Sequence, residues 1–183
     1  MPDIDEVTSA TLFAARAHRA QLRKGDDGDP YVNHVIEVAD RLAVATKGSD
    51  AALVVAGLLH DTVEDCGITL EEIERRFGPT VAALVAEVTD DKALPKAERK
   101  RAQVERAARI SERARLIKMA DKASNLCGIA ELPGIGWPAE RRRAYVAWAD
   151  EVTAHCRGLN DELDRRYDEA RDLALATVRE MAA

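Results

Sequence analysis

The chain has 183 residues, of which 33% are charged and 4% aromatic, and this composition favours one all-α domain over residues 1–183. Its formal net charge of -6 argues against general nucleic-acid binding, and no stretch is long and apolar enough to suggest membrane insertion. The cysteines form no C-x-x-C pair and the acidic N-terminus lacks an apolar signal core, so we expect a cytoplasmic protein without a disulfide framework.

Apolar periodicity, cap residues and turn residues predict the helices in chain order. Asp29 is expected to cap the second helix and Pro30 to open it. Residues 47–50, which end in Asp50, are expected to end the second helix and cap the third, and Thr69 is expected to open the fourth through a capping box. Loops are expected at residues 25–29 and 132–138. The expected helices cover residues 7–22, 30–46, 51–59, 69–78, 80–88 and 112–129, with one or two more from residue 139 onward.

The most informative tract is residues 58–65, where an apolar run ends in a histidine and three acidic residues. Residues 51–59 are all apolar or small, and a helix that is apolar on every side is buried, so its end is buried or lines a cleft. A histidine and carboxylates at such an end would carry a large desolvation cost without partners. A divalent metal is the simplest partner, and a metal with open coordination positions indicates catalysis.

Four residues are candidates to share one ion: His34, His60, Asp61 and Asp121. Adjacent helical residues point about 100° apart, so His60 and Asp61 share an ion only near the helix end. Nitrogen and carboxylate ligands without sulfur suit Mn, Fe or Zn better than Ca. The alternatives are an ordinary helix end with a surface histidine and, for Asp121, a surface salt bridge to a neighbouring basic residue, Lys118 or Arg115.

Further polar residues fit a catalytic site around such an ion. Glu64 and Asp65 follow His60 and Asp61 by four residues, and a carboxylate there can accept a proton from water or protonate a leaving oxygen. Asn125 shares a helical face with Asp121 and could bond a ribose hydroxyl, a phosphate or a metal ligand. An acidic helix end and a solvent-facing asparagine are the respective alternatives.

Two groups of basic residues could bind an anion. Arg23 could stack on a nucleobase or bind phosphate, and Lys24 offers a point charge for phosphate, although a solvated basic pair is the default interpretation. Residues 92–101 contain five Lys or Arg and one Glu, for which we favour a solvated helical face over an anion-attracting surface. We interpret Trp137 and Trp148 as packing residues.

These motifs together resemble the metal-dependent HD hydrolase domain of the RelA/SpoT family. They are most similar to its stand-alone small alarmone hydrolases, the group of the metazoan SpoT homologues. The chain departs from the family pattern at Arg19-Ala20 and at Cys127-Gly128, where the family has an arginine followed by a polar residue. The matching stretches, in order along the chain, are residues 23–24, 30–34, 60–65, 77–79, 88–92, 96–101 and 120–126.

The resemblance implies an all-α HD domain that removes the 3′-pyrophosphate of ppGpp or pppGpp, leaving GDP or GTP. A small-molecule nucleotide is therefore the expected partner, and we expect hydrolase activity only, without a synthetase domain. Similar animal enzymes are also linked to removal of the 2′-phosphate of NADPH, and a non-catalytic nucleotide-binding module or a purely structural helical protein are further alternatives. The roles implied are Mn²⁺ ligation by His34, His60, Asp61 and Asp121, water activation by Glu64 and Asp65, and nucleotide contacts by Arg23, Lys24 and Asn125.

Overall fold

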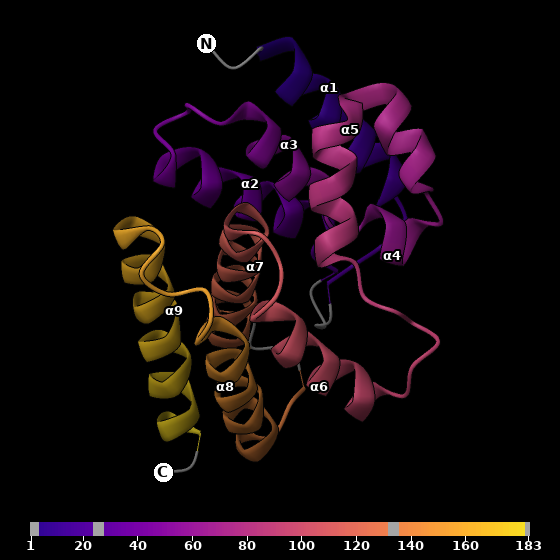
Figure 1. Ribbon diagram of the computed structural model, residues 1–183. Helices are drawn as coiled ribbons and strands as arrows, with labels where there is room; N and C mark the ends of the chain where they lie inside the picture. Colours follow the sequence, from indigo (N-terminus) through magenta and orange to yellow (C-terminus); the bar gives the residue numbers. More distant parts are fainter. Residues whose placement is uncertain (1–3, 24–27, 132–135, 182–183) are drawn as a thin grey trace.

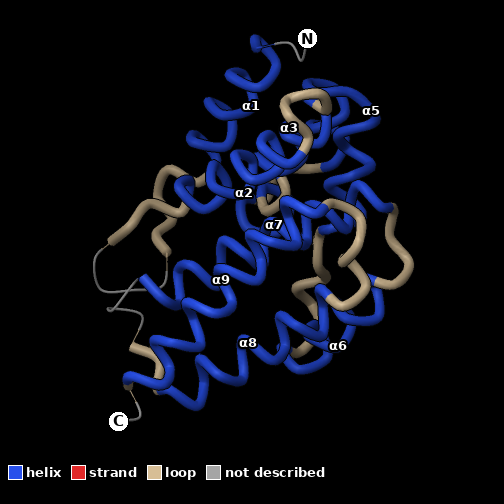
Figure 2. Tube along the Cα trace, turned by 90° about the vertical axis from the view of Figure 1, so that its left-hand side faces the viewer, coloured by secondary structure: helices blue, strands red, loops and turns tan. Residues whose placement is uncertain are grey.

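A computed structural model of the protein describes residues 4–23, 28–131 and 136–181. Over these ranges the fold is all-α, as predicted, and its one extended pairing is an isolated antiparallel bridge between Leu22 and Pro30 (Figures 1 and 2). None of the helices in these ranges combines the length and apolar content that crossing a bilayer requires. The helices are α1 Ile4–Ala17, α2 Val32–Ala45, α3 Ala51–Leu59, α4 Thr62–Cys66, α5 Leu70–Val88, α6 Lys96–Ala107, α7 Glu112–Glu131, α8 Ala139–Thr153 and α9 Asp161–Glu180.

The start of α2 differs from the prediction, and the expected cap by Asp29 is wrong. The backbone just before α2 pairs with the segment that follows α1. Tyr31 N donates to Gln21 O at 2.9 Å, and Arg23 N donates to Asp29 O at 2.8 Å. Pro30 therefore lies in an extended bridge. Tyr31 occupies the N-cap position of α2, but its side chain makes no capping hydrogen bond to the helix. The same pairing ends α1 at Ala17, earlier than the predicted residue 22.

The caps predicted for the third and fourth helices are present. The Asp50 side chain accepts from Leu53 N at 3.0 Å, and Thr69 Oγ1 accepts from Glu72 N at 3.2 Å. The break predicted at residues 78–79 is a kink inside α5, where Gly78 has φ 84° and ψ 166°. Positive φ is accessible to glycine at little cost, and this permits the change of direction before Pro79.

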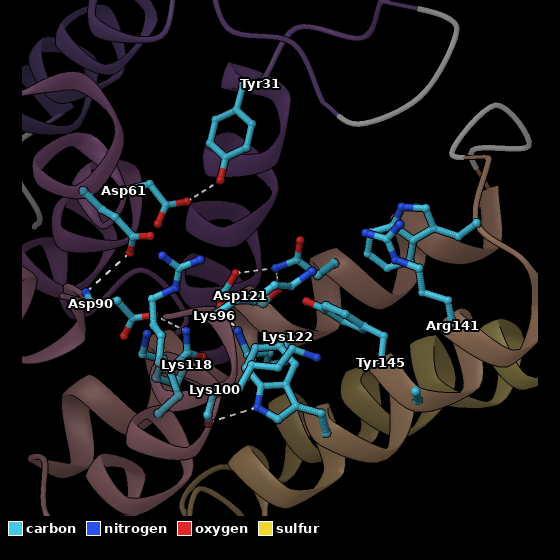
Figure 3. Close-up of a pocket in the computed structure, with 17 residues that line it drawn as sticks. Tyr31, Asp61, Asp90, Lys96, Lys100, Lys118, Asp121, Lys122, Arg141 and Tyr145 are labelled. Carbon is cyan, nitrogen blue, oxygen red and sulfur yellow. Dashed lines mark hydrogen bonds and ion pairs between the residues drawn. The ribbon is translucent and has the colours of Figure 1, made fainter. Parts of the chain in front are cut away.

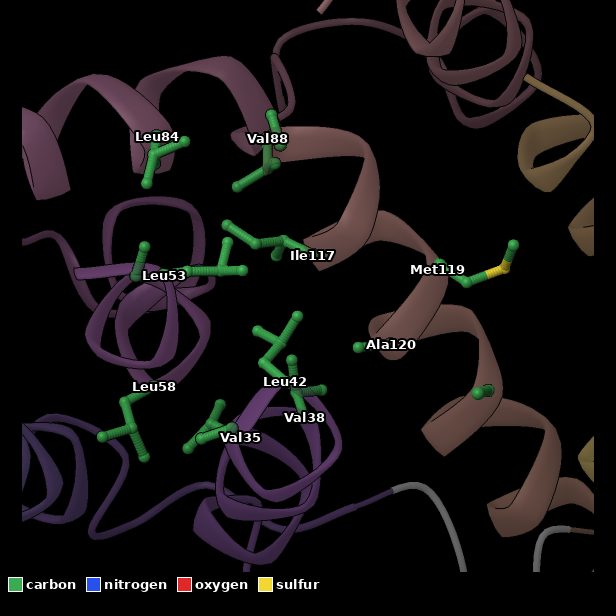
Figure 4. Packing of buried hydrophobic residues seen from close by; sticks show 14 of the residues in the cluster. Val35, Val38, Leu42, Leu53, Leu58, Leu84, Val88, Ile117, Met119 and Ala120 are labelled. Carbon is green, nitrogen blue, oxygen red and sulfur yellow. The ribbon is translucent and has the colours of Figure 1, made fainter. Parts of the chain in front are cut away.

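The core forms where α3 packs against α1, α2 and α5, and where α7 packs against α2, α5, α8 and α9 (Figures 1 and 2). Leu42, Leu53 and Ile117 meet in this core from three different helices (Figure 4). Gly57 allows α2 and α3 to approach closely, because a Cβ atom there would lie 2.6 Å from Leu42 Cδ1. This close contact places the end of α3 beside the first turn of α2, where the polar site forms.

Candidate metal centre and nucleotide pocket

The candidate ligands come from three separate parts of the chain. His34, His60 and Asp121 offer ligand atoms that all lie within 4.8 Å of one another, and Asp61 adjoins both histidines. His34 lies in the first turn of α2, His60 and Asp61 connect α3 to α4, and Asp121 lies in the middle of α7. His60 Nε2 is 3.0 Å from Asp61 Oδ2, and His34 Nε2 is 3.3 Å from Asp121 Oδ1. The two cross distances, from His34 to Asp61 and from His60 to Asp121, are 3.8 and 3.9 Å. Two ligand atoms that each lie about 2.1 Å from the same ion are separated from one another by distances comparable to these.

The chemistry of the two histidines fits a divalent ion. The Nε2 atoms of His34 and His60 are buried and have no hydrogen-bond partner, which is costly for a polar atom. His60 Nδ1 is 2.8 Å from the carbonyl oxygen of Gly57, which can only accept, so Nδ1 carries the proton in the neutral ring and Nε2 a lone pair. Metal-bound histidines characteristically donate their second nitrogen in this way.

The electric field at the site favours a cation. Burial lowers the pKa of His60, but the charges of Asp61 and Asp121, together with hydrogen bonding, outweigh burial and raise this pKa to about 9. Burial would raise the pKa of Asp121, but Lys122 and the two histidines together outweigh burial and hold this pKa well below its usual range. Burial would also raise the pKa of Asp61, but His60 and His34 together lower it below its usual range. Both carboxylates are therefore ionised at neutral pH, and the negative charge that would hold an ion also attracts a proton to the imidazole.

Asp61 and Asp121 each also have a hydrogen-bonded neighbour on the pocket side, Tyr31 and Lys122 respectively (Figure 3). Tyr31 Oη donates to Asp61 Oδ2 at 2.5 Å, and Lys122 Nζ donates to Asp121 Oδ2 at 2.7 Å. Asn125 Nδ2 donates to Asp121 Oδ1 at 2.6 Å, so Asn125 lies beside Asp121 as its spacing predicted. The surface salt bridge considered for Asp121 is wrong, because its side chain is buried and pairs with Lys122. Tyr31 was not singled out from the sequence, although it lies within a matching stretch.

The two carboxylates of α4, Glu64 and Asp65, lie beside this cluster with different partners. Glu64 Oε2 accepts from the backbone N–H of Asp90 at 3.4 Å. Burial, followed by the charges of Asp61, Asp90 and Asp65, raises the pKa of Glu64, as suits a proton acceptor. Asp65 Oδ2 accepts from Gln21 Nε2 at 2.8 Å, and its other oxygen pairs with the ammonium of Lys92.

A cavity of about 330 Å³, here called the cationic pocket, opens next to Asp61 and Asp121 (Figure 3). Burial, followed by the charges of Lys96 and Lys122, lowers the pKa of Lys100, which indicates a concentration of positive charge. Trp148 forms part of the wall, with Lys100 Nζ and Lys122 Nζ at 4.4 and 4.6 Å from its ring centroid. The cations that line the pocket are Lys96, Arg99, Lys100, Lys118, Lys122 and Arg141.

The sequence interpretation of residues 92–101 as a solvated face is therefore wrong for the part of α6 that faces the pocket. The error has a physical reason, since the pocket exists only where α6 meets α7 and α8. Trp148, interpreted as a packing residue, packs and also lines the cavity.

A second cavity of about 460 Å³, here called the Arg23 pocket, adjoins the first. Arg23 lines it and is held by Glu37 Oε1 at 3.2 Å, whereas Lys24 lies outside the described residues. Gly128, one of the departures from the family pattern, also lines this cavity, and Arg41 donates to Cys127 Sγ at 3.2 Å behind it. The residues that line both cavities are Tyr31, Glu64, Arg99, Asn125, Trp137 and Tyr145.

Comparison with known proteins places this site in a family. The profile of the HD domain family matches residues 10–149. The chain is 48% identical over 157 residues to the Drosophila melanogaster protein named guanosine-3′,5′-bis(diphosphate) 3′-pyrophosphohydrolase MESH1, covering 86% of this chain and 88% of that one. It is 46% identical over 159 residues to the Homo sapiens protein of the same name, covering 87% and 89%.

Two solved structures are also similar. One, described as a metazoan ortholog of SpoT that hydrolyses ppGpp, has a TM-score of 0.86 at 45% identity and covers 93% of this chain and 95% of its own. The other, lmo0812 from Listeria monocytogenes EGD-e, has a TM-score of 0.65 at 32% identity, covering 80% and 99%. The chain therefore belongs to the HD domain family and, within it, to the family of the MESH1 proteins.

Proposed function

We propose that this protein is a metal-dependent guanosine-3′,5′-bis(diphosphate) 3′-pyrophosphohydrolase, which converts ppGpp or pppGpp to GDP or GTP and pyrophosphate. The observation that carries this proposal is the pair of buried, unpartnered Nε2 atoms of His34 and His60, which face two ionised carboxylates beside a cationic pocket. The activity named for relatives that are 46–48% identical over most of their length supports the choice of reaction.

The proposed metal is Mn²⁺, which mixed imidazole and carboxylate ligands without sulfur suit well. When bound, the ion would supply positive charge to the 3′-phosphate and increase the acidity of a nearby water. The proposed ligands are His34, His60, Asp61 and Asp121, all of which lie within 3.9 Å of a partner in the cluster.

Glu64 is proposed to take the proton from the attacking water, with Asp65 assisting. Its raised pKa makes it a better proton acceptor than an ordinary glutamate near neutral pH. The bond from phosphorus to the ribose 3′-oxygen then breaks, and this oxygen needs a proton because an alkoxide is a poor leaving group. Glu64, which has taken a proton from the water, can donate that proton to the ribose 3′-oxygen. Asp65, fixed by Gln21, keeps a second negative charge beside the base.

The two cavities divide the substrate between them in this proposal. The cationic pocket takes the phosphate groups, because its lysines and arginines can pair with phosphate oxygens. The Arg23 pocket takes the nucleoside, with Arg23, Lys24 and Asn125 as proposed contacts.

We also propose that residues 1–183 form one domain and that the protein is cytoplasmic. The second proposal rests on its three cysteines, Cys66, Cys127 and Cys156, which are free.

A substrate panel tests the proposal. Metal-free protein supplied with Mn²⁺ should release pyrophosphate from ppGpp and pppGpp, and NADPH assayed in parallel tests the alternative 2′-phosphatase activity. Glu64→Gln should still bind ppGpp but lose turnover, which separates catalysis from folding and binding. If the wild type binds ppGpp without releasing pyrophosphate, the protein is a nucleotide-binding module and the proposed activity is wrong.

A further inference from the structure

A chain of hydrogen bonds approaches His34 from the side away from the carboxylates. His34 Nδ1 is 2.9 Å from Ser124 Oγ, and Ser124 Oγ donates to Glu37 Oε2 at 2.5 Å. The other oxygen of Glu37 pairs with Arg23 at 3.2 Å, and Arg23 also donates to the backbone carbonyl of Ser124 at 3.4 Å. Ser124 is fully buried on α7, one turn after Asp121, so solvent does not replace its contacts.

The directions of these hydrogen bonds determine which nitrogen of His34 carries the proton. The two carboxylate oxygens of Glu37 accept hydrogen bonds, one from the Arg23 guanidinium and the other from Ser124 Oγ. The single hydroxyl proton of Ser124 therefore goes to Glu37, and Ser124 Oγ can only accept from His34. His34 Nδ1 is thus the protonated nitrogen, and Nε2 presents its lone pair toward Asp121.

We propose that Ser124 and Glu37 are positioning residues that hold His34 in the tautomer and ring orientation needed to ligate the metal. The inference rests on the proposed function, because it assumes an ion at this centre. The same task at His60 is performed by the backbone carbonyl of Gly57, which no side-chain substitution removes. Of the two histidines, His34 is therefore the one whose orientation depends on side chains. The Glu37 side chain also pairs with Arg23, which lines the Arg23 pocket.

The test is the affinity of metal-free protein for Mn²⁺, measured by isothermal titration calorimetry and independent of turnover. Ser124→Ala should weaken Mn²⁺ binding about 10- to 100-fold, the usual effect of losing a partner of a metal-bound histidine. Ser124→Thr, which keeps the hydroxyl, should recover most of the affinity. Glu37→Gln, on the partly exposed α2 surface, should give a smaller loss because its amide oxygen can still accept from Ser124.

Matched controls separate positioning from general damage. Ser9→Ala lies on the exposed face of α1, and Asp40→Asn removes one charge from α2 one turn after Glu37. Both controls should bind Mn²⁺ like the wild type. The inference is overturned if Ser124→Ala and Glu37→Gln also bind like the wild type while remaining folded. A wild type that binds Mn²⁺ but releases no pyrophosphate from ppGpp overturns the proposed function and leaves the positioning chain supported by the affinities.

Discussion

The ammonium of Lys122 lies 2.7 Å from Asp121 Oδ2, while Oδ1 of the same carboxylate faces His34 Nε2 at 3.3 Å. Both partners are almost fully buried, with 4% of Lys122 and 7% of Asp121 exposed. Burial lowers the pKa of Lys122, but the charge of Asp121, together with its hydrogen bond and the neighbouring Tyr145 and Asp90, outweighs burial and raises this pKa above its usual value. Lys122 thus pairs with one oxygen of Asp121, and the other oxygen, which faces His34, is left available to bind an ion.

Replacing Lys122 should therefore destabilise the metal-free protein more than the metal-bound protein. Lys122→Met leaves a buried carboxylate without its counter-charge, which we expect to cost about 3–5 kcal/mol in free energy of unfolding. Saturating Mn²⁺ should reduce the deficit, because the ion supplies positive charge to the same carboxylate. Urea denaturation with and without Mn²⁺ measures both values.

Lys118→Met is the matched control for this prediction. Lys118 is buried one turn earlier on α7, but its ammonium donates to the carbonyl of Val88 at 2.7 Å instead of to a metal-ligand candidate. Its effect on stability should not depend on Mn²⁺. An unchanged deficit for Lys122→Met at saturating Mn²⁺ would contradict the shared role of Asp121.

The pH dependence of turnover should report Glu64. Burial and the neighbouring carboxylates raise its pKa from the usual 4.5, and the proton acceptor must be ionised to act. Activity should accordingly fall as pH decreases through a midpoint above 4.5. Glu64→Gln should lower kcat by about 10²–10⁴-fold. A pH–rate profile whose acidic limb lies at or below the value of an ordinary glutamate would rule out this role.

The same shift has a consequence for the stability of the metal-free protein. A raised carboxyl pKa means that the ionised form is disfavoured in the folded state, so a penalty appears as pH rises through the interval from 4.5 to the folded value. Glu64→Gln should remove this penalty, and the metal-free variant should be at least as stable as the wild type near pH 7. The difference should vanish in acid, where both folded and unfolded carboxyls are protonated. Thermal melts across pH measure the effect.

Arg99 and Arg101 form a matched pair on α6 that tests the cationic pocket. Arg99 lines both cavities, whereas Arg101 is exposed two residues later and lines neither. Arg99→Gln should lower kcat/KM for ppGpp about 10- to 100-fold, as expected for the loss of a charged hydrogen bond to phosphate. Arg101→Gln should change it about twofold at most. Equal effects of the two substitutions would indicate only general electrostatic attraction.

Gly57→Ala should destabilise the protein, although alanine is the better helix former. The new Cβ would lie 2.6 Å from the buried Leu42 Cδ1, and overpacking of a core costs about 1–3 kcal/mol. We expect a net loss of about 1–2 kcal/mol after the helix-propensity gain. In a Leu42→Ala background the contact is absent, so the same substitution should become neutral or stabilising. Additive effects in this double-mutant cycle would refute the steric explanation.

The sequence predicted most of the helices, although not α4 or α6, and it singled out polar side chains that lie together in the structure, for a physical reason. His60 and Asp61 end an apolar helix, and Asp121 follows another apolar stretch, so each had to be buried near a partner. The local caps at Asp50 and Thr69 were likewise readable, because each involves residues only three positions apart.

What the sequence missed depends on pairings between distant residues. The start of α2 follows from the bridge between Leu22 and Pro30, which competes with the local cap signal of Asp29. The pocket wall around Lys100 and Trp148 arises where α6 meets α8, residues that are 48 positions apart. The spacing of apolar residues within one helix does not predict such contacts. Each of these helices, taken alone, has the polar surface expected of a solvent-exposed helix.

In the proposed function, hydrolysis of ppGpp requires one divalent ion that His34, His60, Asp61 and Asp121 hold. The most direct measurement is a titration of metal-free protein with Mn²⁺ while pyrophosphate release from ppGpp is followed, with Asp121→Asn treated identically. The wild type should gain activity that saturates near one ion per chain and is lost on chelation, and the variant should need far more Mn²⁺. Pyrophosphate release that persists after complete chelation, or none at saturating Mn²⁺, would contradict the claim.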